Sequence, residues 1–217
     1  MTTLKQQTDA KIEAGRQANP DFMKGIDDVI AQAKAFQQGN DAIKLGAQAP
    51  RFELPNQQGK SVSLDDLLTK GPVVVTFYRG SWCPYCNLQL RALQEKLGEI
   101  HGLGAELIAI SPQVPDGSLS KDEISAMDFI VLSDQNAKVA AKFGVAWVVP
   151  EFMLEHMRVD RKLDLEAINN GNGSIMPIPA TFVLNSAGEV TWRFVDVDYR
   201  TRSEPADIID ALQKLSL

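Results

Sequence analysis

Phe77-Tyr78-Arg79-Gly80-Ser81-Trp82-Cys83-Pro84-Tyr85-Cys86 joins a predicted strand to a predicted helix. The run that leads into it, residues 73–78, is continuously β-branched or aromatic, which is typical of a strand covered on both faces. Leucines and isoleucines then recur at helical spacing from Leu88 to Ile100, and Gly102 ends the helix. A second apolar run, residues 106–110, predicts another buried strand. The order strand, helix, strand indicates a βαβ unit and therefore a parallel sheet.

The chain has only two cysteines, and both lie at this junction. We expect Cys83 at the helix N-cap with Pro84 at the first helical position, where a missing backbone N–H costs nothing. The positive end of the helix dipole favours a thiolate there, and Arg79 could add a positive charge. Cys86 falls in the same first turn, close enough to form a small disulfide ring with Cys83. This spacing predicts a reactive Cys83 and a resolving Cys86, which would act on a sulfenic acid or a mixed disulfide.

Two simpler interpretations compete with this one. The cysteines could be small buried hydrophobic residues at a helix start, or half of a metal site. A zinc site needs two further ligands, and the only histidines, His101 and His156, lack the usual paired spacing. We therefore expect neither a metal nor a cofactor.

The composition excludes several functional classes. A chain of 217 residues with 44% hydrophobic and 23% charged residues is an ordinary globular protein, one domain with an appendage. No apolar run approaches the roughly 18 residues that span a bilayer, so we expect no membrane partner. With 28 acidic and 22 basic residues the net charge is -6, which argues against nucleic acid. The polar residues 1–17 lack a secretory signal, so we expect a cytoplasmic protein in which a permanent structural disulfide is disfavoured.

The rest of the chain predicts a helical extension, residues 1–45, before an α/β domain, residues 46–217. An amphipathic helix at 21–38 has an apolar face that could cap this domain or pair with a second copy, as a homodimer. The domain has further expected elements: a third strand at 129–132, helices at 120–126, 136–143 and 204–215, and an antiparallel hairpin of strands at 180–184 and 189–195. These elements predict a central mixed sheet flanked by helices.

Two groups of aromatic and charged residues remain open. Trp82 and Tyr85 beside the cysteines could form an apolar rim for a substrate or partner, or simply pack. Residues 196–200 mix charge with an aromatic ring after the hairpin, and we interpret them as a solvated strand end with no catalytic part.

Two motifs together resemble the thioredoxin fold. They are Trp82-Cys83-Pro84-Tyr85-Cys86 after a buried strand and Ile178-Pro179-Ala180-Thr181 before a late hairpin. In that fold, a proline before the hairpin is in the cis form and packs against the reactive cysteines. Pro179 matches this position, so the resemblance implies a cis bond there.

More closely, the chain from Gly46 is similar to the peroxiredoxin-like branch of the alkyl hydroperoxide reductase C and thiol-specific antioxidant (AhpC/TSA) family. Residues 46–55, 77–88 and 177–184 carry this resemblance, which covers residues 46–217. The wider family consists of thiol peroxidases that reduce hydrogen peroxide and organic hydroperoxides and are recycled by thioredoxin or a similar donor. The resemblance implies that Cys83 is the peroxidatic cysteine and that Cys86 is a candidate resolving cysteine.

The sequence departs from that family at three positions. Peroxiredoxins hold the peroxide with a proline, a threonine or serine, and an arginine, and Thr76, Gly80 and Pro179 stand in those places here. Other donors, such as Arg79, Ser81 or backbone amides at the helix start, would have to stabilise the transition state. The Cys-Pro-Tyr-Cys spacing and Pro179 are typical of thiol–disulfide exchange enzymes, so an oxidoreductase acting on protein disulfides is the competing prediction. A third is a binding or holdase module whose cysteines are vestigial or only sense oxidation.

Overall fold

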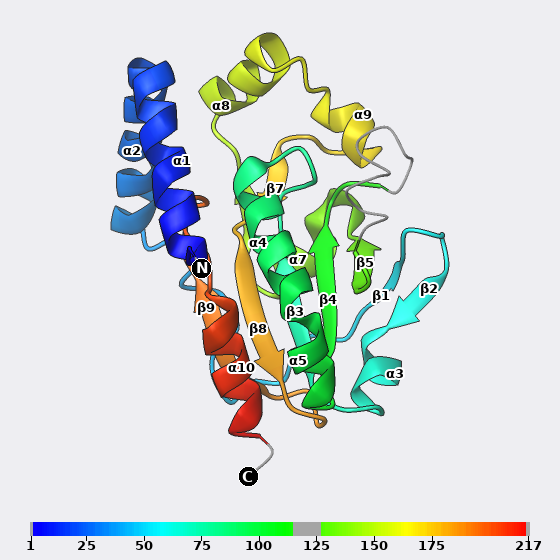
Figure 1. The fold of residues 1–217 in the computed structure, drawn as a ribbon. Helices are drawn as coiled ribbons and strands as arrows, with labels where there is room; N and C mark the ends of the chain where they lie inside the picture. The colour runs from blue at the N-terminus through cyan, green and yellow to red at the C-terminus, as the bar shows by residue number, and fades with distance from the viewer. Residues whose placement is uncertain (1, 115–126, 216–217) are drawn as a thin grey trace.

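The computed structural model describes residues 2–114 and 127–215. Its centre is a five-stranded mixed sheet with strand order β5-β4-β3-β8-β9 (Figure 1). The strands are β3 (Val73–Phe77), β4 (Glu106–Ser111), β5 (Ile130–Ser133), β8 (Ala180–Leu184) and β9 (Val190–Val195). Strands β3, β4 and β5 run parallel, whereas β8 runs antiparallel to both β3 and β9. The predicted α/β class, the βαβ unit and the late hairpin are confirmed.

The sheet separates two apolar cores because successive strand residues point to opposite faces. On β3, Val74 belongs to one core, and Val73, Val75 and Phe77 belong to the other. The first core contains residues of α4 (Pro84–Glu95), α5 (Leu97–Gly102) and α10 (Pro205–Gln213), and the second contains residues of α3 (Leu64–Leu68) and α7 (Lys138–Lys142). The helix predicted after Cys83 is thus two helices, which meet at Lys96.

Shorter elements complete the domain. The strand pairs are β1 (Glu53–Pro55) with β2 (Ser61–Ser63), and β6 (Ala146–Val148) with β7 (Ile175–Pro177). The short helices are η1 (Gln135–Ala137), α8 (Glu151–Glu155), η2 (His156–Asp160) and α9 (Leu165–Asn169). The helix predicted at 136–143 is shorter than expected, because Asn136 and Ala137 have positive φ angles and α7 begins only at Lys138. The helix predicted at 120–126 lies outside the described residues.

Two consecutive helices, α1 (Leu4–Ala18) and α2 (Pro20–Ala35), form the N-terminal extension. Asn19 separates them: its side chain accepts the backbone N–H of Phe22, and Pro20 occupies the first position of α2. Ile26 and Ile30 of α2 belong to the first core, and Ala33 belongs to the second. The apolar face of α2 is therefore buried within this chain. It does not support the predicted homodimer. A division at residue 45 stays a prediction.

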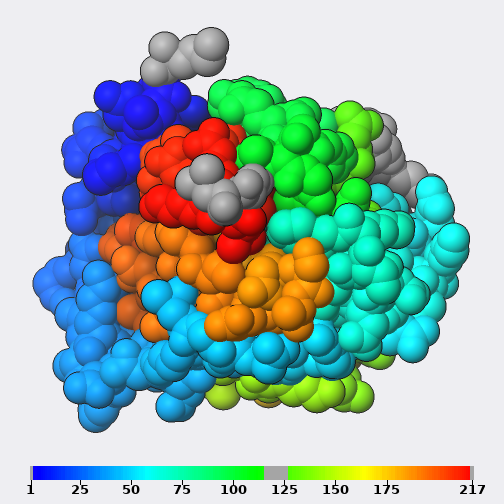
Figure 2. Space-filling view, turned by 90° about the horizontal axis from the view of Figure 1, so that it is seen from below, coloured from blue at the N-terminus to red at the C-terminus, as the bar shows by residue number. Residues whose placement is uncertain are grey.

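The extension and the C-terminal helix are neighbours. Seen from below, the red helix α10 lies between the blue N-terminal residues and the green residues of α4 and α5 (Figure 2). Helix α1 packs against both α2 and α4. No helix within the described ranges has the length and apolar character needed to cross a membrane.

Candidate active site

Both thiols are buried at the N-terminus of α4. Cys83 is the N-cap with extended backbone angles, and Pro84 follows at the first helical position, as the sequence predicts. The Cys83 N–H donates to the Gly80 carbonyl at 3.1 Å, and the Cys83 carbonyl accepts the Asn87 N–H at 3.1 Å. Cys83 is 1% exposed and Cys86 is 0% exposed, and neither is in a disulfide. The site is therefore a reduced thiol pair under a protein cover.

Two arginines and the second thiol decide the ionisation of Cys83. Burial alone would raise its pKa, but a hydrogen bond from the Cys86 thiol and the positive charges of Arg79 and Arg202 lower it to about 5. Burial raises the pKa of Cys86, and the hydrogen bond and negative charge of Cys83 raise it further. Arg202 acts against this rise from close by, since its Nη2 lies 3.2 Å from Cys86 Sγ. At neutral pH the pair consists of a Cys83 thiolate and a Cys86 thiol.

Arg79 is buried between aromatic rings. Its guanidinium carbon lies 5.0 Å from the ring centroid of Trp82 and 4.3 Å from that of Tyr199, and the residue is 3% exposed. Its Nε and Nη2 atoms have no hydrogen-bond partner within the described part of the chain, and neither does Trp82 Nε1. Cation–π contacts thus hold the charge near Cys83 and leave hydrogen-bond donors unused.

Gly80 occupies the place where the resemblance expects a threonine. Its φ of +145° is one that residues with a side chain rarely adopt, and a Cβ there would lie 2.3 Å from Trp82 Nε1. The indole of Trp82 fills the space of the missing side chain, so this position cannot supply a hydroxyl donor.

The hydroxyl groups of Ser81 and Thr76 have protein partners. Ser81 donates its backbone N–H and its hydroxyl to Gln113 Oε1, at 2.9 and 3.1 Å. The hydroxyl of Thr76 lies 3.0 Å from that of Thr181, inside the sheet. Ser81 therefore fixes the turn to the residues after β4.

Trp82 and Tyr85 are both 8% exposed and belong to the same apolar core as the cysteines. The Tyr85 ring meets the Tyr199 ring edge to face at 5.9 Å, and the Trp82 carbonyl accepts a hydrogen bond from Arg161 Nη2 at 3.1 Å. The two aromatic residues pack, and they do not form an open rim.

Pro179 is buried directly before β8, but its peptide bond is trans, since the described residues contain no cis bond. The cis bond implied by the resemblance to thioredoxin is therefore wrong. The Ile178 N–H donates to the Val145 carbonyl and continues the pairing of β6 with β7. The chain runs from this pairing directly into β8.

Sequence reasoning missed Arg202 and Tyr199, which follow β9. The interpretation of residues 196–200 as a solvated strand end is wrong, because Asp198, Tyr199 and Arg200 are 8%, 8% and 5% exposed. The strand register explains their position. Phe77 pairs with Ala180, and Ala180 pairs with Val195, so the end of β9 lies at the same edge of the sheet as the end of β3. In the sequence, the signal that could have identified these residues was the run of charged side chains after the predicted hairpin.

No group of three or more histidine, cysteine or acidic side chains that could hold a metal ion occurs within residues 2–114 and 127–215.

Comparisons with known proteins place this site in context. A sequence model described as the AhpC/TSA family matches residues 45–193. Peroxiredoxin Bcp of Escherichia coli is 33% identical over 111 residues, which cover 51% of this chain and 70% of that protein. Chloroplastic peroxiredoxin Q of Gentiana triflora is 33% identical over 103 residues, 48% of this chain and 47% of that protein. Among solved structures, peroxidoxin BcpB from Mycobacterium tuberculosis aligns with a TM-score of 0.61 and 24% identity, over 80% of this chain and 98% of that one.

Proposed function

The chain belongs to the AhpC/TSA family, and on that premise we propose that it reduces hydrogen peroxide and organic hydroperoxides through Cys83. Cys86 is the resolving thiol, and thioredoxin or a similar dithiol returns the electrons. As a peroxiredoxin-like member of the family, the chain is a thiol-dependent peroxidase. The observation that carries the finer proposal is the Cys83 thiol, whose pKa of about 5 makes it a thiolate at neutral pH.

In the first step, the Cys83 thiolate attacks one oxygen of the hydroperoxide. An S–O bond forms and the O–O bond breaks, so that Cys83 becomes a sulfenic acid while the peroxide is reduced. The other oxygen leaves as an alkoxide or hydroxide and takes up a proton from water. The unused donors of Arg79 and Trp82 Nε1 and the charge of Arg202 are suited to stabilise the developing negative charge. They would take over the task of the family's missing threonine and arginine.

In the second step, Cys86 attacks the oxidised sulfur of Cys83. Once Cys83 carries no negative charge, two causes of the raised pKa of Cys86 disappear, and Arg202 remains 3.2 Å away to favour the thiolate. An S–S bond forms and hydroxide leaves, to be protonated to water. The donor dithiol then reduces this disulfide. The first oxidation therefore activates the second thiol.

The competing function is exchange with protein disulfides. The Cys-Pro-Tyr-Cys spacing favours it, and Gly80 lacks the hydroxyl with which peroxiredoxins hold the peroxide. In the oxidation step burial favours the peroxide, because Cys83 is 1% exposed and a protein disulfide could reach it only by displacing part of the protein around it. A molecule the size of hydrogen peroxide needs a much smaller opening. Thioredoxin must cause the same displacement as a protein disulfide when it later reduces the Cys83–Cys86 disulfide. We also propose a cytoplasmic location, where thioredoxin and glutathione keep thiols reduced.

The test is an assay of NADPH oxidation with the thioredoxin system and either hydrogen peroxide or cumene hydroperoxide. The proposal predicts sustained peroxide-dependent turnover that the Cys83→Ser variant lacks. In Cys86→Ser, peroxide should give a Cys83 sulfinic acid by mass spectrometry, whereas the wild type gives a Cys83–Cys86 disulfide. Reduction of insulin without peroxide consumption would support the competing function. Turnover in neither assay would favour the binding module.

A further inference from the structure

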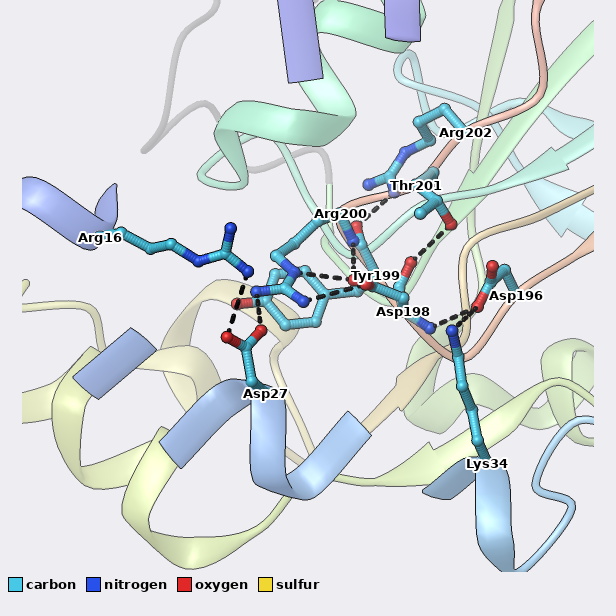
Figure 3. A network of polar contacts seen from close by, with 9 residues as sticks. All are labelled: Arg16, Asp27, Lys34, Asp196, Asp198, Tyr199, Arg200, Thr201 and Arg202. Carbon is cyan, nitrogen blue, oxygen red and sulfur yellow. Dashed lines mark hydrogen bonds and ion pairs between the residues drawn. The ribbon is translucent and has the colours of Figure 1, made fainter. Parts of the chain in front are cut away.

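The segment between β9 and α10, residues 196–204, is held by the N-terminal helices at three points. We call it the arginine loop, because it carries Arg200 and Arg202. Figure 3 shows Asp27 of α2 facing Arg200, with Arg16 of α1 on the other side of the same carboxylate. The extension therefore reaches a segment that also touches the thiols.

The central contact is an ion pair with a buried guanidinium. Arg200 Nη1 lies 2.7 Å from Asp27 Oδ1, and Arg16 Nη2 lies 3.2 Å from Asp27 Oδ2. The Arg200 side chain also binds Asp198 in its own loop, with Nε at 2.8 Å from Oδ1 and Nη2 at 3.0 Å from Oδ2. Burial works against ionisation of Asp27, but the hydrogen bonds and charges of Arg200 and Arg16 hold its pKa below the usual value. Arg200 thus pairs with one carboxylate of its own loop, Asp198, and with one of the extension, Asp27.

Both ends of the arginine loop are tied to the same helices. At one end, Lys34 Nζ lies 3.8 Å from Asp196 Oδ1, and the same oxygen accepts the Asp198 N–H at 2.8 Å. At the other end, the Glu204 carboxylate accepts the first backbone N–H groups of α1, from Leu4 at 3.3 Å and Lys5 at 2.6 Å. A carboxylate at a helix N-terminus is favoured by the helix dipole.

The middle of the arginine loop supplies one side chain that contacts a thiol and one that contacts Arg79. Arg202 donates from Nη2 to Cys86 Sγ at 3.2 Å, and its Nη1 donates back to the carbonyls of Tyr199 and Thr201. The Tyr199 ring lies under the guanidinium of Arg79. Arg202 stands only two residues after Arg200, in the same loop.

We propose that Asp27 is a positioning residue: through Arg200 it keeps Tyr199 under Arg79 and Arg202 beside Cys86, so that the N-terminal extension sets where the positive charges around the thiol pair lie. This role goes beyond the proposed peroxidase function, because the ionisation of a thiol can be measured whatever its oxidant is.

The test is the pH dependence of Cys83 alkylation by iodoacetamide, followed at Cys83 by mass spectrometry, in the full-length Asp27→Asn variant. Charge alone predicts a lower Cys83 pKa in this variant, because a negative charge is removed and Arg200 is unmasked. The proposal predicts the opposite. Since an opposite charge within a few ångströms shifts a pKa by about 1–3 units, displacement of Arg202 should raise the midpoint by about one unit.

The matched control is Asp28→Asn, which removes the same charge from the neighbouring position. Among the described residues, Asp28 pairs with the exposed Lys24 alone, at 2.7 Å, so its removal should leave the midpoint within about 0.2 units. Asp27→Glu keeps the carboxylate and should restore most of the wild-type value. Circular dichroism checks that each variant is folded, which we expect because the Asp27 side chain is 37% exposed.

A double-variant comparison separates positioning from a general loss of structure. Arg202→Met should raise the midpoint by itself, and adding Asp27→Asn should then change it little, because the two act through one contact. A midpoint in Asp27→Asn that is unchanged or lower would overturn the proposal, and so would a further full rise in the double variant. Neither outcome depends on peroxidase activity, so a failure here is distinct from a failure of the proposed function.

Discussion

Gly80 and Trp82 together decide what the turn before Cys83 can contact. The glycine has no side chain and the indole takes that space. Among the described residues, Arg79, Trp82 and Arg202 each keep a buried hydrogen-bond donor without a partner. The site therefore differs from the family pattern in its hydrogen-bond donors. Arg79 and Arg202 supply positive charge beside the reactive sulfur.

Alanine substitutions at Gly80 and Gly98 should change the free energy of unfolding in opposite directions. Gly80→Ala places a methyl group against Trp82 Nε1 at a positive φ, so we expect a loss of about 1–3 kcal/mol in the free energy of unfolding and slower Cys83 alkylation. Gly98→Ala, in α5, meets nothing within 4 Å and should stabilise the protein by up to about 1 kcal/mol. Urea unfolding measures both. A Gly80→Ala protein as stable and as reactive as the wild type would contradict this account.

At the scale of elements, α2 is part of the folded core and also the support of the arginine loop. Its apolar residues at helical spacing bury against both faces of the sheet, and Phe22 stacks on His156 of η2 at 3.8 Å between ring centroids. The segment after η2 donates from Arg161 to the Trp82 carbonyl. One helix thus contacts the segments on both sides of the thiol pair.

This packing predicts the cost of a cavity in α2. Ile26 is 0% exposed, so Ile26→Ala should lower the free energy of unfolding by about 2–5 kcal/mol, as for any large core residue. Gln32→Ala, on the exposed side of the same helix, should change it by less than about 0.5 kcal/mol. Urea unfolding again gives both values. If Ile26→Ala cost no more than Gln32→Ala, α2 would be an appendage that the domain does not need.

For the whole molecule, the ionisation of the two thiols makes the free energy of unfolding depend on pH. The folded protein lowers the pKa of Cys83 from 9.0 to about 5, so folding favours its thiolate. This contribution is complete above the unfolded pKa and is lost as the pH falls through about 5. The pKa of Cys86 is raised, so its contribution has the opposite sign and is lost as the pH rises above 9.0.

The reduced protein should therefore become more stable as the pH rises from about 5.5 to about 8, with a slope of at most about 1.4 kcal/mol per pH unit. Other groups titrate as well, so the informative quantity is the difference in unfolding free energy between the wild type and Cys83→Ser, measured with urea under reducing conditions. This difference should grow with pH in that window. A difference that stays constant there would mean that Cys83 is not a thiolate in the folded protein.

The sequence by itself determined the βαβ unit, the hairpin, the buried strands and the position of Cys83 at a helix N-cap. These features depend on hydrophobic period, on proline and glycine signals and on neighbours within one helical turn, all of which can be read along the chain. The same local pattern indicated the inequivalence of Cys83 and Cys86, whose roles as peroxidatic and resolving thiols stay a proposal.

Only the tertiary structure decided which charges surround the thiols. Arg202 lies 116 residues from Cys86 in sequence, and the sheet register that joins them cannot be read from either segment alone. Asp27 and Asp198 both pair with Arg200 in the fold, which is why a segment interpreted as solvated is buried. The trans bond at Pro179 is likewise visible only in the folded chain. A charge acts on a thiol through distance and desolvation, and both are properties of the packed molecule.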